Sequence, residues 1–367
     1  MKLEKYCGRA AMAALGLCGA CAHAQSSVTI YGTMDANVGR YKGSNAGVAV
    51  GDHAVWKQET GGLQDSFLGI RGTEDLGDGW AAVFDLESFI RLDTGQSGRA
   101  DATVTPTINV SGDPFWSRAS WVGIESRKWG RVRFGQQATA IWLSSVQSNA
   151  FAGSTDFSPI NLLMFLNSPS ILAGGTRWSN AIAYDSPNIS GFTFALHAAP
   201  GEGSGGRNAG GRLTYANGPF VANLAYSDVK KDPITFSEGT SRSNTKNMLL
   251  GLSYDFKVVH VFAHAGRIKT DGSGTPARTD DNITHRIWEV SAAVPIGAGR
   301  FLIGYGQRKG DEVAPVSQRK LGSVGYAYSL SRRTELYALL RSDETRRQGA
   351  AVDASGTSYA LGFKHSF

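Results

Sequence analysis

Two histidines spaced four residues apart, His260 and His264, are the first residues of this chain whose types and spacing suggest chemistry. In an extended strand both side chains project from one face, where their imidazole nitrogens could bind a metal ion. A zinc site needs three or four protein ligands, and the sequence identifies no further ligand for this pair. We therefore expect solvated histidines and no metal site.

Catalytic side chains do not stand out either. Nucleophilic hydrolysis needs a serine, a cysteine or an activated water beside a histidine and a carboxylate. Serines and histidines are present without any motif that groups them, and the three cysteines are Cys7, Cys18 and Cys21. We expect no catalytic residue, no cofactor and no enzyme activity.

Two carboxylates, Asp85 and Glu87, share one face of an alternating segment over residues 80–87. The opposite face carries Trp80, Ala82, Phe84 and Leu86. Because side chains alternate between the two faces of a strand, this segment predicts a strand with an apolar environment on one side and a polar one on the other.

The chain ends in a strand with the same alternation. One of its faces carries Tyr359, Leu361, Phe363, His365 and Phe367. In a soluble sheet such a strand would leave an apolar edge, whereas in a closed barrel in lipid it pairs with the first strand and no edge remains. The ending therefore predicts a membrane barrel.

Residues 1–24 have the composition of a secretory signal peptide, with a basic start, a short apolar run and an Ala-His-Ala cleavage pattern. No run in the chain reaches the ~18 apolar residues of a membrane-spanning helix. Cleavage after Ala24 leaves 343 residues without cysteine, whereas a lipoprotein attached at Cys21 is the alternative. The mature balance of 34 basic against 30 acidic residues is too even to indicate nucleic-acid binding.

The rest of the chain consists of alternating segments of about ten residues, joined by short and long connections in turn. Short connections such as 76–79 and 216–219 carry the glycine, asparagine and proline of tight turns. The long connections are roughly 41–64, 89–114, 138–176, 198–210, 229–244, 269–284, 310–317 and 346–356. Eight long loops predict an all-β fold, a 16-stranded antiparallel transmembrane β-barrel that forms one domain over residues 25–367. A soluble secreted β-sandwich is the alternative, but it gives no reason for the terminal phenylalanine.

Several motifs follow one another in a fixed order. They are residues 27–35 (SVTIYGTMD), 68–79 (LGIRGTEDLGDG), 117–118 with 121–124, 130–137 (GRVRFGQQ) and the terminal Phe367. In this order and spacing, the mature chain resembles the Gram-negative general diffusion porins of the β-proteobacterial branch. The resemblance implies a homotrimer in the outer membrane, and a water-filled channel for small hydrophilic solutes and anions. It also implies contact with outer-membrane lipid and lipopolysaccharide, and assembly by the barrel-assembly machinery with Phe367 as the signal.

In such porins the third loop folds into the lumen, and its carboxylates face arginines on the opposite wall. Matching positions in this chain are Arg71, Arg118 and Arg177 for the arginines, and Glu87 for a lumenal glutamate. The chain departs from the family at Phe67, where an arginine is usual, and at Gln136, where a Gly-Arg-Gln run is usual. Its third loop is also unusual, because residues 138–176 contain no lysine or arginine, a single acid and many apolar residues. Within that loop, a Ser-Pro pair before residues 160–166 predicts a short helical turn.

We expect the pore constriction to be lined by Arg71, Arg118, Arg133, Arg177, Asp85, Glu87 and Asp156. Cations outnumber acids in this set, and low-dielectric walls focus the field of a few charges, so we expect a mild preference for anions. Each arginine could instead brace the wall through an ion pair, and Asp156 could cap a turn. The alternative functions are a channel for one solute class, suggested by Phe67 and the apolar loop, and an outer-membrane barrel hydrolase.

Overall fold

The computed structural model describes residues 26–43, 54–98, 114–167, 170–171, 175–201, 207–230, 234–236, 239–273, 282–311, 317–347 and 354–367. The leader predicted over residues 1–24 and part of each of the eight predicted long loops lie outside these ranges.

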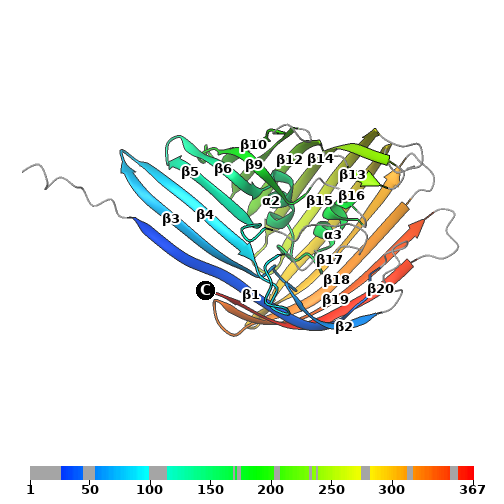
Figure 1. Ribbon diagram of the computed structural model, residues 1–367. Helices are drawn as coiled ribbons and strands as arrows, with labels where there is room; N and C mark the ends of the chain where they lie inside the picture. The colour runs from blue at the N-terminus through cyan, green and yellow to red at the C-terminus, as the bar shows by residue number, and fades with distance from the viewer. Residues whose placement is uncertain are drawn as a thin grey trace, which may run out of the picture.

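Strands make up most of the described chain (Figure 1). The first nine are β1 (Ser27–Tyr41), β2 (Val55–Thr60), β3 (Phe67–Gly77), β4 (Trp80–Phe89), β5 (Ala119–Ser126), β6 (Gly130–Ala138), β7 (Leu166–Asn167), β8 (Ser170–Ile171) and β9 (Arg177–Asp185). The next six are β10 (Phe192–Ala199), β11 (Asn208–Asn217), β12 (Phe220–Lys230), β13 (Ile234–Phe236), β14 (Gly239–Asp255) and β15 (His260–Ser273). The last five are β16 (Asn282–Ile296), β17 (Gly299–Asp311), β18 (Ser317–Ser329), β19 (Thr334–Arg347) and β20 (Ala354–Ser366). The helices are α2 (Ala140–Gln147) and α3 (Pro159–Phe165).

Sixteen strand positions form a closed antiparallel barrel, as the sequence predicted. On one side β1 pairs first with β3 and then with β2, so that these two short strands occupy one position in the wall. On its other side β1 pairs with the last strand, β20, and closes the ring. The short β13 pairs with β14 as an addition to the wall, and β7 pairs only with β8.

Apolar side chains cover the outside of the barrel. In β14, Met248 and Leu250 are exposed while Leu249 between them is fully buried. In β20, Tyr359 and Phe363 are exposed while Ala360 is buried. The face predicted for the terminal strand is therefore confirmed, and in lipid the exposed faces of both strands meet hydrocarbon.

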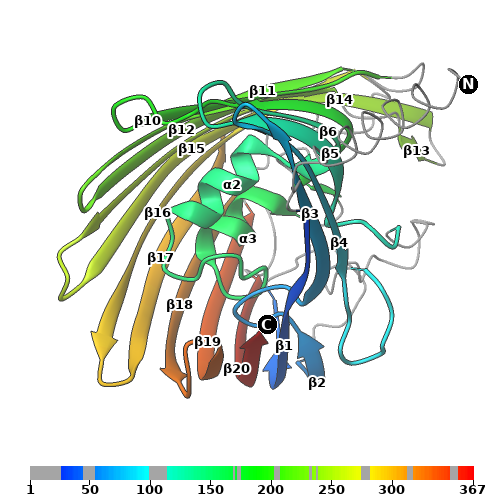
Figure 2. The ribbon, with the colours of Figure 1, turned by 90° about the vertical axis from the view of Figure 1, so that its left-hand side faces the viewer.

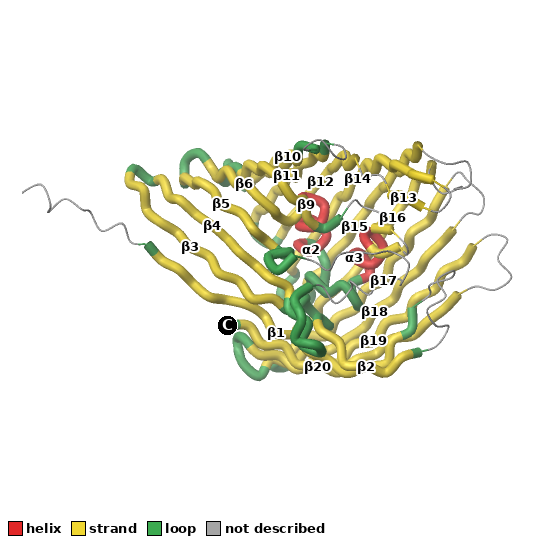
Figure 3. The backbone as a smooth tube through the Cα atoms, viewed as in Figure 1, coloured by secondary structure: helices red, strands yellow, loops and turns green. Residues whose placement is uncertain are grey.

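Short turns join the strands at one end of the barrel (Figure 3). The turn between β3 and β4 has positive φ angles at Gly77 and Asp78, of 84° and 53°. Glycine adopts such angles without a steric penalty, and aspartate tolerates them better than most residues. The tight turn predicted at residues 76–79 is confirmed.

Helices α2 and α3 of the third loop lie inside the ring of strands (Figure 2). Helix α2 packs against β11, β12 and β14, and helix α3 packs against β16, β17 and β18. Ile141 and Leu163 join Leu249 and Leu321 of the inner wall in one apolar cluster. Burial of these side chains against the wall explains why the loop is so apolar. Neither helix of the described residues is long and apolar enough to cross a membrane.

Helix α3 confirms the helical turn predicted near residues 160–166, whereas α2 was not predicted. The first turn of α2 is capped by Thr139, whose Oγ1 accepts a hydrogen bond of 3.2 Å from the main-chain N–H of Trp142. Residues on several faces of α2 are buried, so its sequence shows no clear alternation of an apolar and a polar face at helical spacing.

Candidate functional site

The inner wall of the first strands brings several predicted residues together. Arg71 lies opposite Asp85 in the register of β3 and β4. The hydroxyl oxygen of Tyr31 lies 2.6 Å from Asp85 Oδ1 and 2.7 Å from Glu87 Oε1. Because a tyrosine hydroxyl carries one hydrogen, it donates to one of these carboxylates at a time. The guanidinium carbon of Arg71 lies 4.6 Å from the centre of the Tyr31 ring, so Tyr31 connects both carboxylates to this arginine.

Arg118, just before β5, pairs with the carboxylate of Glu87. Its guanidinium carbon also lies 3.8 Å from the centre of the Phe67 ring, a distance typical of a cation–π contact. The residue at position 67 is 6% exposed, because the guanidinium covers the ring. Phe67 therefore supports Arg118 and does not offer a free apolar surface to a passing solute.

Arg177, at the start of β9, reaches the same place from a distant part of the chain. Its Nε donates a 2.7 Å hydrogen bond to the main-chain oxygen of Arg118, and its guanidinium carbon lies 4.6 Å from the centre of the Phe89 ring. We call Arg71, Asp85, Glu87, Arg118 and Arg177 the arginine cluster. With three arginines and two carboxylates, its formal charge is +1.

Arg133 is not part of this cluster. Its Nη2 lies 2.9 Å from a carboxylate oxygen of Asp185 on β9, and Arg131 binds the same carboxylate at 3.2 Å. Arg131 also approaches Glu125 at 3.9 Å. Arg212 of β11 is the register partner of Ala195 on β10, which is in turn the register partner of Asp185. We call these five residues the β6–β11 arginine group. Its formal charge is also +1, and sequence reasoning identified only Arg133.

Asp156 lies on yet another part of the wall. Its main-chain oxygen accepts a hydrogen bond from Arg341 of β19. The neighbouring Thr155 donates a 3.0 Å hydrogen bond to Asp65, in the segment between β2 and β3. Asp156 is thus brought to the wall around β19 and not into the arginine cluster.

Two further arginines, which sequence reasoning missed, hold helix α3 against the wall. Arg308 donates a 2.8 Å hydrogen bond to the main-chain oxygen of Leu163. Arg319 donates to the main-chain oxygen of Leu162 at 3.4 Å and binds Asp343 at 2.8 and 3.0 Å. The last carbonyls of a helix have no partner within it, so these arginines supply one. Strand alternation was the available signal, because each arginine occupies an inward position.

A buried aspartate, also missed, shapes the break between β2 and β3. Asp35 accepts hydrogen bonds of 2.9–3.2 Å from the main-chain N–H groups of residues 62–64 and one of 2.5 Å from the Tyr337 hydroxyl. The segment it holds contacts the third loop, where Ser154 Oγ donates to the main-chain oxygen of Gly62 at 2.7 Å. Asp35 therefore positions one of the supports of the loop.

The two histidines behave differently from each other. His264 is buried, with Nδ1 2.8 Å from Glu289 Oε2, so the predicted solvation is wrong for this residue. The reason is that the end of α2 covers the wall at this level, where Ser148 approaches Gly251, the register partner of His264. His260 stacks on Phe262, with ring centres 4.1 Å apart. Among the described residues, no group of three or more histidine, cysteine or acidic side chains could hold a metal ion.

Comparison with known proteins gives a consistent result. The profile of the Gram-negative porin family matches residues 10–348. An outer membrane porin protein of Bordetella pertussis is 28% identical, covering 96% of this chain and 97% of its own. Outer membrane porin protein 32 of Delftia acidovorans is 29% identical, covering 97% and 98%. The solved structure of an anion-selective porin from Comamonas acidovorans matches with a TM-score of 0.73 and 25% identity, over 94% of this chain and 100% of that one.

Proposed function

Because this chain belongs to the Gram-negative porin family, it is an outer-membrane diffusion channel and not an enzyme, and we propose that it mildly prefers anions. Passive diffusion of small hydrophilic solutes and ions needs no energy source. The observation that carries the anion preference is the arginine cluster, with its excess of one positive charge on the inner wall. A relative described as anion-selective supports the same sign.

We place the permeation path between the third loop and the wall formed by β3, β4, β5, β6 and β9. The packing of α2 and α3 against other strands supports this placement. The arginine cluster lies on the proposed side, and so does the β6–β11 arginine group except for Arg212, which donates a 2.9 Å hydrogen bond to Gln147 of α2. A solute would therefore meet one after the other, and without Arg212 they contain five arginines and four carboxylates. Low-dielectric walls would focus this net charge onto the path.

Each of the seven residues expected at the constriction has a place in this proposal. Arg71, Arg118, Arg177, Asp85 and Glu87 would set the charge at the narrowest point. Arg133 would act closer to the periplasmic turns, where Asp185 offsets part of its charge. Asp156 would belong to the opposite side of the path, close to Arg341.

The sign of the selectivity gives a direct test. The purified protein is inserted into a planar bilayer, and the reversal potential is measured across a tenfold gradient of potassium chloride. We expect a potential of the sign produced by faster chloride permeation. Clear cation selectivity would overturn the assignment of the arginines to the permeation path.

A channel dedicated to one solute class is less well supported. Its main sequence argument was an aromatic residue facing the lumen, but Arg118 covers that ring. A specific channel would show a solute that blocks the ion current at low concentration. A general channel would show no such saturation.

We further propose the assembly and export that the family suggests. Residues 1–24 would be removed as a signal peptide, and three copies would associate in the outer membrane, in contact with its lipid and lipopolysaccharide. Phe367 would serve as the signal for the barrel-assembly machinery. Its proposed role is compatible with its position, where main-chain hydrogen bonds of 3.1 and 3.2 Å join it to Gly32 of β1.

A further inference from the structure

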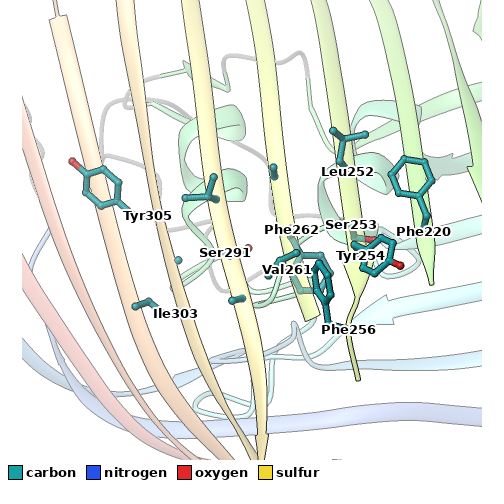
Figure 4. A pocket seen from close by; sticks show the side chains of 14 residues that line it. Phe220, Leu252, Ser253, Tyr254, Phe256, Val261, Phe262, Ser291, Ile303 and Tyr305 are labelled. Carbon is teal, nitrogen blue, oxygen red and sulfur yellow. The ribbon is translucent and has the colours of Figure 1, made fainter. Parts of the chain in front are cut away.

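The inner wall has no side chain at two successive inward positions of β17. Ile303 and Tyr305 of this strand lie on the outer face of the barrel (Figure 4). Gly304 and Gly306 alternate with them and therefore face inward, where both are buried. A glycine inside a strand often marks a place where another part of the chain approaches closely.

At Gly304 the part that approaches is the third loop. A Cβ atom at this position would lie 3.1 Å from Phe151 Cε2 and 3.3 Å from Pro159 Cγ. Carbon atoms pack favourably at about 3.5–4.0 Å, so even a methyl group would push on both rings. The neighbouring Ser291 of β16 also holds the loop, because its Oγ accepts a 3.2 Å hydrogen bond from the main-chain N–H of Ala150. The loop is therefore fixed low on this part of the wall.

Gly306 is crowded in a different way. A Cβ atom there would lie 2.9 Å from Leu163 Cδ1 of α3, but also 2.8 Å from the main-chain oxygen of Trp288 in the wall itself. The three atoms nearest to a Cβ at Gly304 all belong to side chains. A substitution at Gly304 therefore acts on the loop with less disturbance of the main chain of the wall.

The loop has little room to yield in any other direction. All seven residues of α3 are buried, and Phe151 is 1% exposed. The rings of Phe165 in α3 and Trp142 in α2 lie 5.2 Å apart and connect the two helices. Because closely packed interiors transmit strain, a side chain added at Gly304 should move the loop away from the wall and into the lumen.

We propose that Gly304 determines the size limit of this channel, because its missing side chain lets the third loop lie low on β17 and leaves the rest of the lumen open. This inference rests on the proposed permeation path, which runs on the opposite side of the loop. A methyl group at Gly304 should move the two rings by about 0.4–0.9 Å, the difference between 3.1 Å and an ordinary contact. Valine reaches one bond further, by up to about 1.5 Å.

The test measures single-channel conductance, together with the entry of neutral sugars of increasing size into proteoliposomes. Conductance should fall in the order wild type, Gly304→Ala, Gly304→Val, and the largest sugars should lose entry first. Valine favours strands, so the wall itself should tolerate it. The control is Gly322→Val on the outer face of β18, where the atom nearest to a Cβ is Tyr305 Cδ2 at 3.5 Å. It should conduct like the wild type.

A compensating substitution separates the position of the loop from general damage. The double variant Gly304→Val/Phe151→Leu adds as many carbon atoms to the wall as it removes from the loop, and cores tolerate such volume-conserving changes best. We expect the double variant to regain nearly the conductance and sugar entry of the wild type. A variant that acted only by weakening the core would not be rescued by the loss of a buried ring.

Three results would overturn the proposal: unchanged conductance in Gly304→Val, an equal loss in Gly322→Val, or a double variant that conducts no better than Gly304→Val. Heat-modifiable migration on gels shows whether each variant forms the barrel. If Gly304→Val does not, Gly304→Ala and the double variant give the same comparison. An anion-selective wild type whose Gly304 variants all conduct normally would refute this inference alone and leave the proposed function intact.

Discussion

Replacing Arg118 by glutamine should remove most of the anion preference of this channel. Arg118 is the member of the arginine cluster that contacts both Glu87 and Phe67, and its side chain is about one-fifth exposed. The substitution lowers the formal charge of the cluster from +1 to zero. It keeps a polar side chain at this position, although glutamine is two bonds shorter than arginine and loses the guanidinium contact with Phe67.

The size of the effect follows from Coulomb's law. A unit charge acts on an ion about 7 Å away in water with an energy of about 0.6 kcal/mol. Losing that charge makes an anion less stable and a cation more stable by this amount, so the permeability ratio should change by about 1.2 kcal/mol, or about sevenfold. At 1 M salt the screening length falls to about 3 Å, and most of this difference should disappear.

The assay is the reversal potential in potassium chloride gradients, measured at about 0.1 M mean salt, where screening is moderate. A charge cycle with Glu87→Gln separates charge from geometry. Glu87→Gln should raise the cluster to +2 and strengthen the anion preference. The double variant Arg118→Gln/Glu87→Gln returns it to +1 and should regain nearly the wild-type ratio.

Two outcomes would refute this reasoning. The first is an unchanged permeability ratio in Arg118→Gln, which would mean that the cluster lies off the permeation path. The second is a double variant that keeps the ratio of Arg118→Gln, which would mean that geometry and not charge sets selectivity. Arg332→Gln, in an exposed periplasmic turn, serves as a control for charge removal far from the cluster.

Three further variants test the supports of the lumen. Arg308→Leu removes the arginine that donates to the main-chain oxygen of Leu163 near the end of α3. The free energy that holds this helix folded should fall by about 1–3 kcal/mol, so hydrogen exchange over residues 159–165 should become faster. Asp35→Ala removes the acceptor of three main-chain N–H groups, so the free energy of unfolding should fall by about 3 kcal/mol. The urea midpoint should therefore fall, and protease should cleave within residues 61–66. Phe67→Ala removes the ring beneath Arg118, and single-channel conductance should rise. We expect no solute that blocks the current of the wild type but not that of the variant.

Each of these variants has a matched control on the outer or turn surface. Lys320→Leu is the control for Arg308→Leu and should leave hydrogen exchange in α3 unchanged. Glu74→Ala is the control for Asp35→Ala and should leave the urea midpoint unchanged. Phe301→Ala is the control for Phe67→Ala and should leave conductance unchanged. An Arg308→Leu protein with normal exchange in α3 would show that packing alone holds the helix. A solute whose block of the current is lost in Phe67→Ala would revive the solute-specific channel.

The strand pattern could be predicted because it depends on a local property. Side chains alternate with a period of two, and lipid on one side makes that alternation visible in segments such as 248–256 and 358–367. The short helix α3 could be predicted for the same local reason, from a Ser-Pro start. Helix α2 could not, because apolar surroundings on several sides remove its periodicity.

The partners of the charged residues needed the folded chain. The sequence identified Arg118, Arg177 and Glu87 as neighbours only through a family resemblance, and it gave no sign that Phe67 and Phe89 support the two arginines. Arg308 and Arg319 occupy inward positions that alternation could have identified. Their role as anchors of α3 could not be read from any local pattern.

What the sequence determined by itself is the barrel, its strand number and the family, because alternation, turn residues and motif order are written along the chain. Only the tertiary structure decided which charges meet and which wall the helices of the third loop cover. The physical reason is that charge acts through space, between residues such as Arg133 and Asp185 that lie 52 positions apart. Closure of the ring brings such residues together, and no pattern within a single strand contains that information.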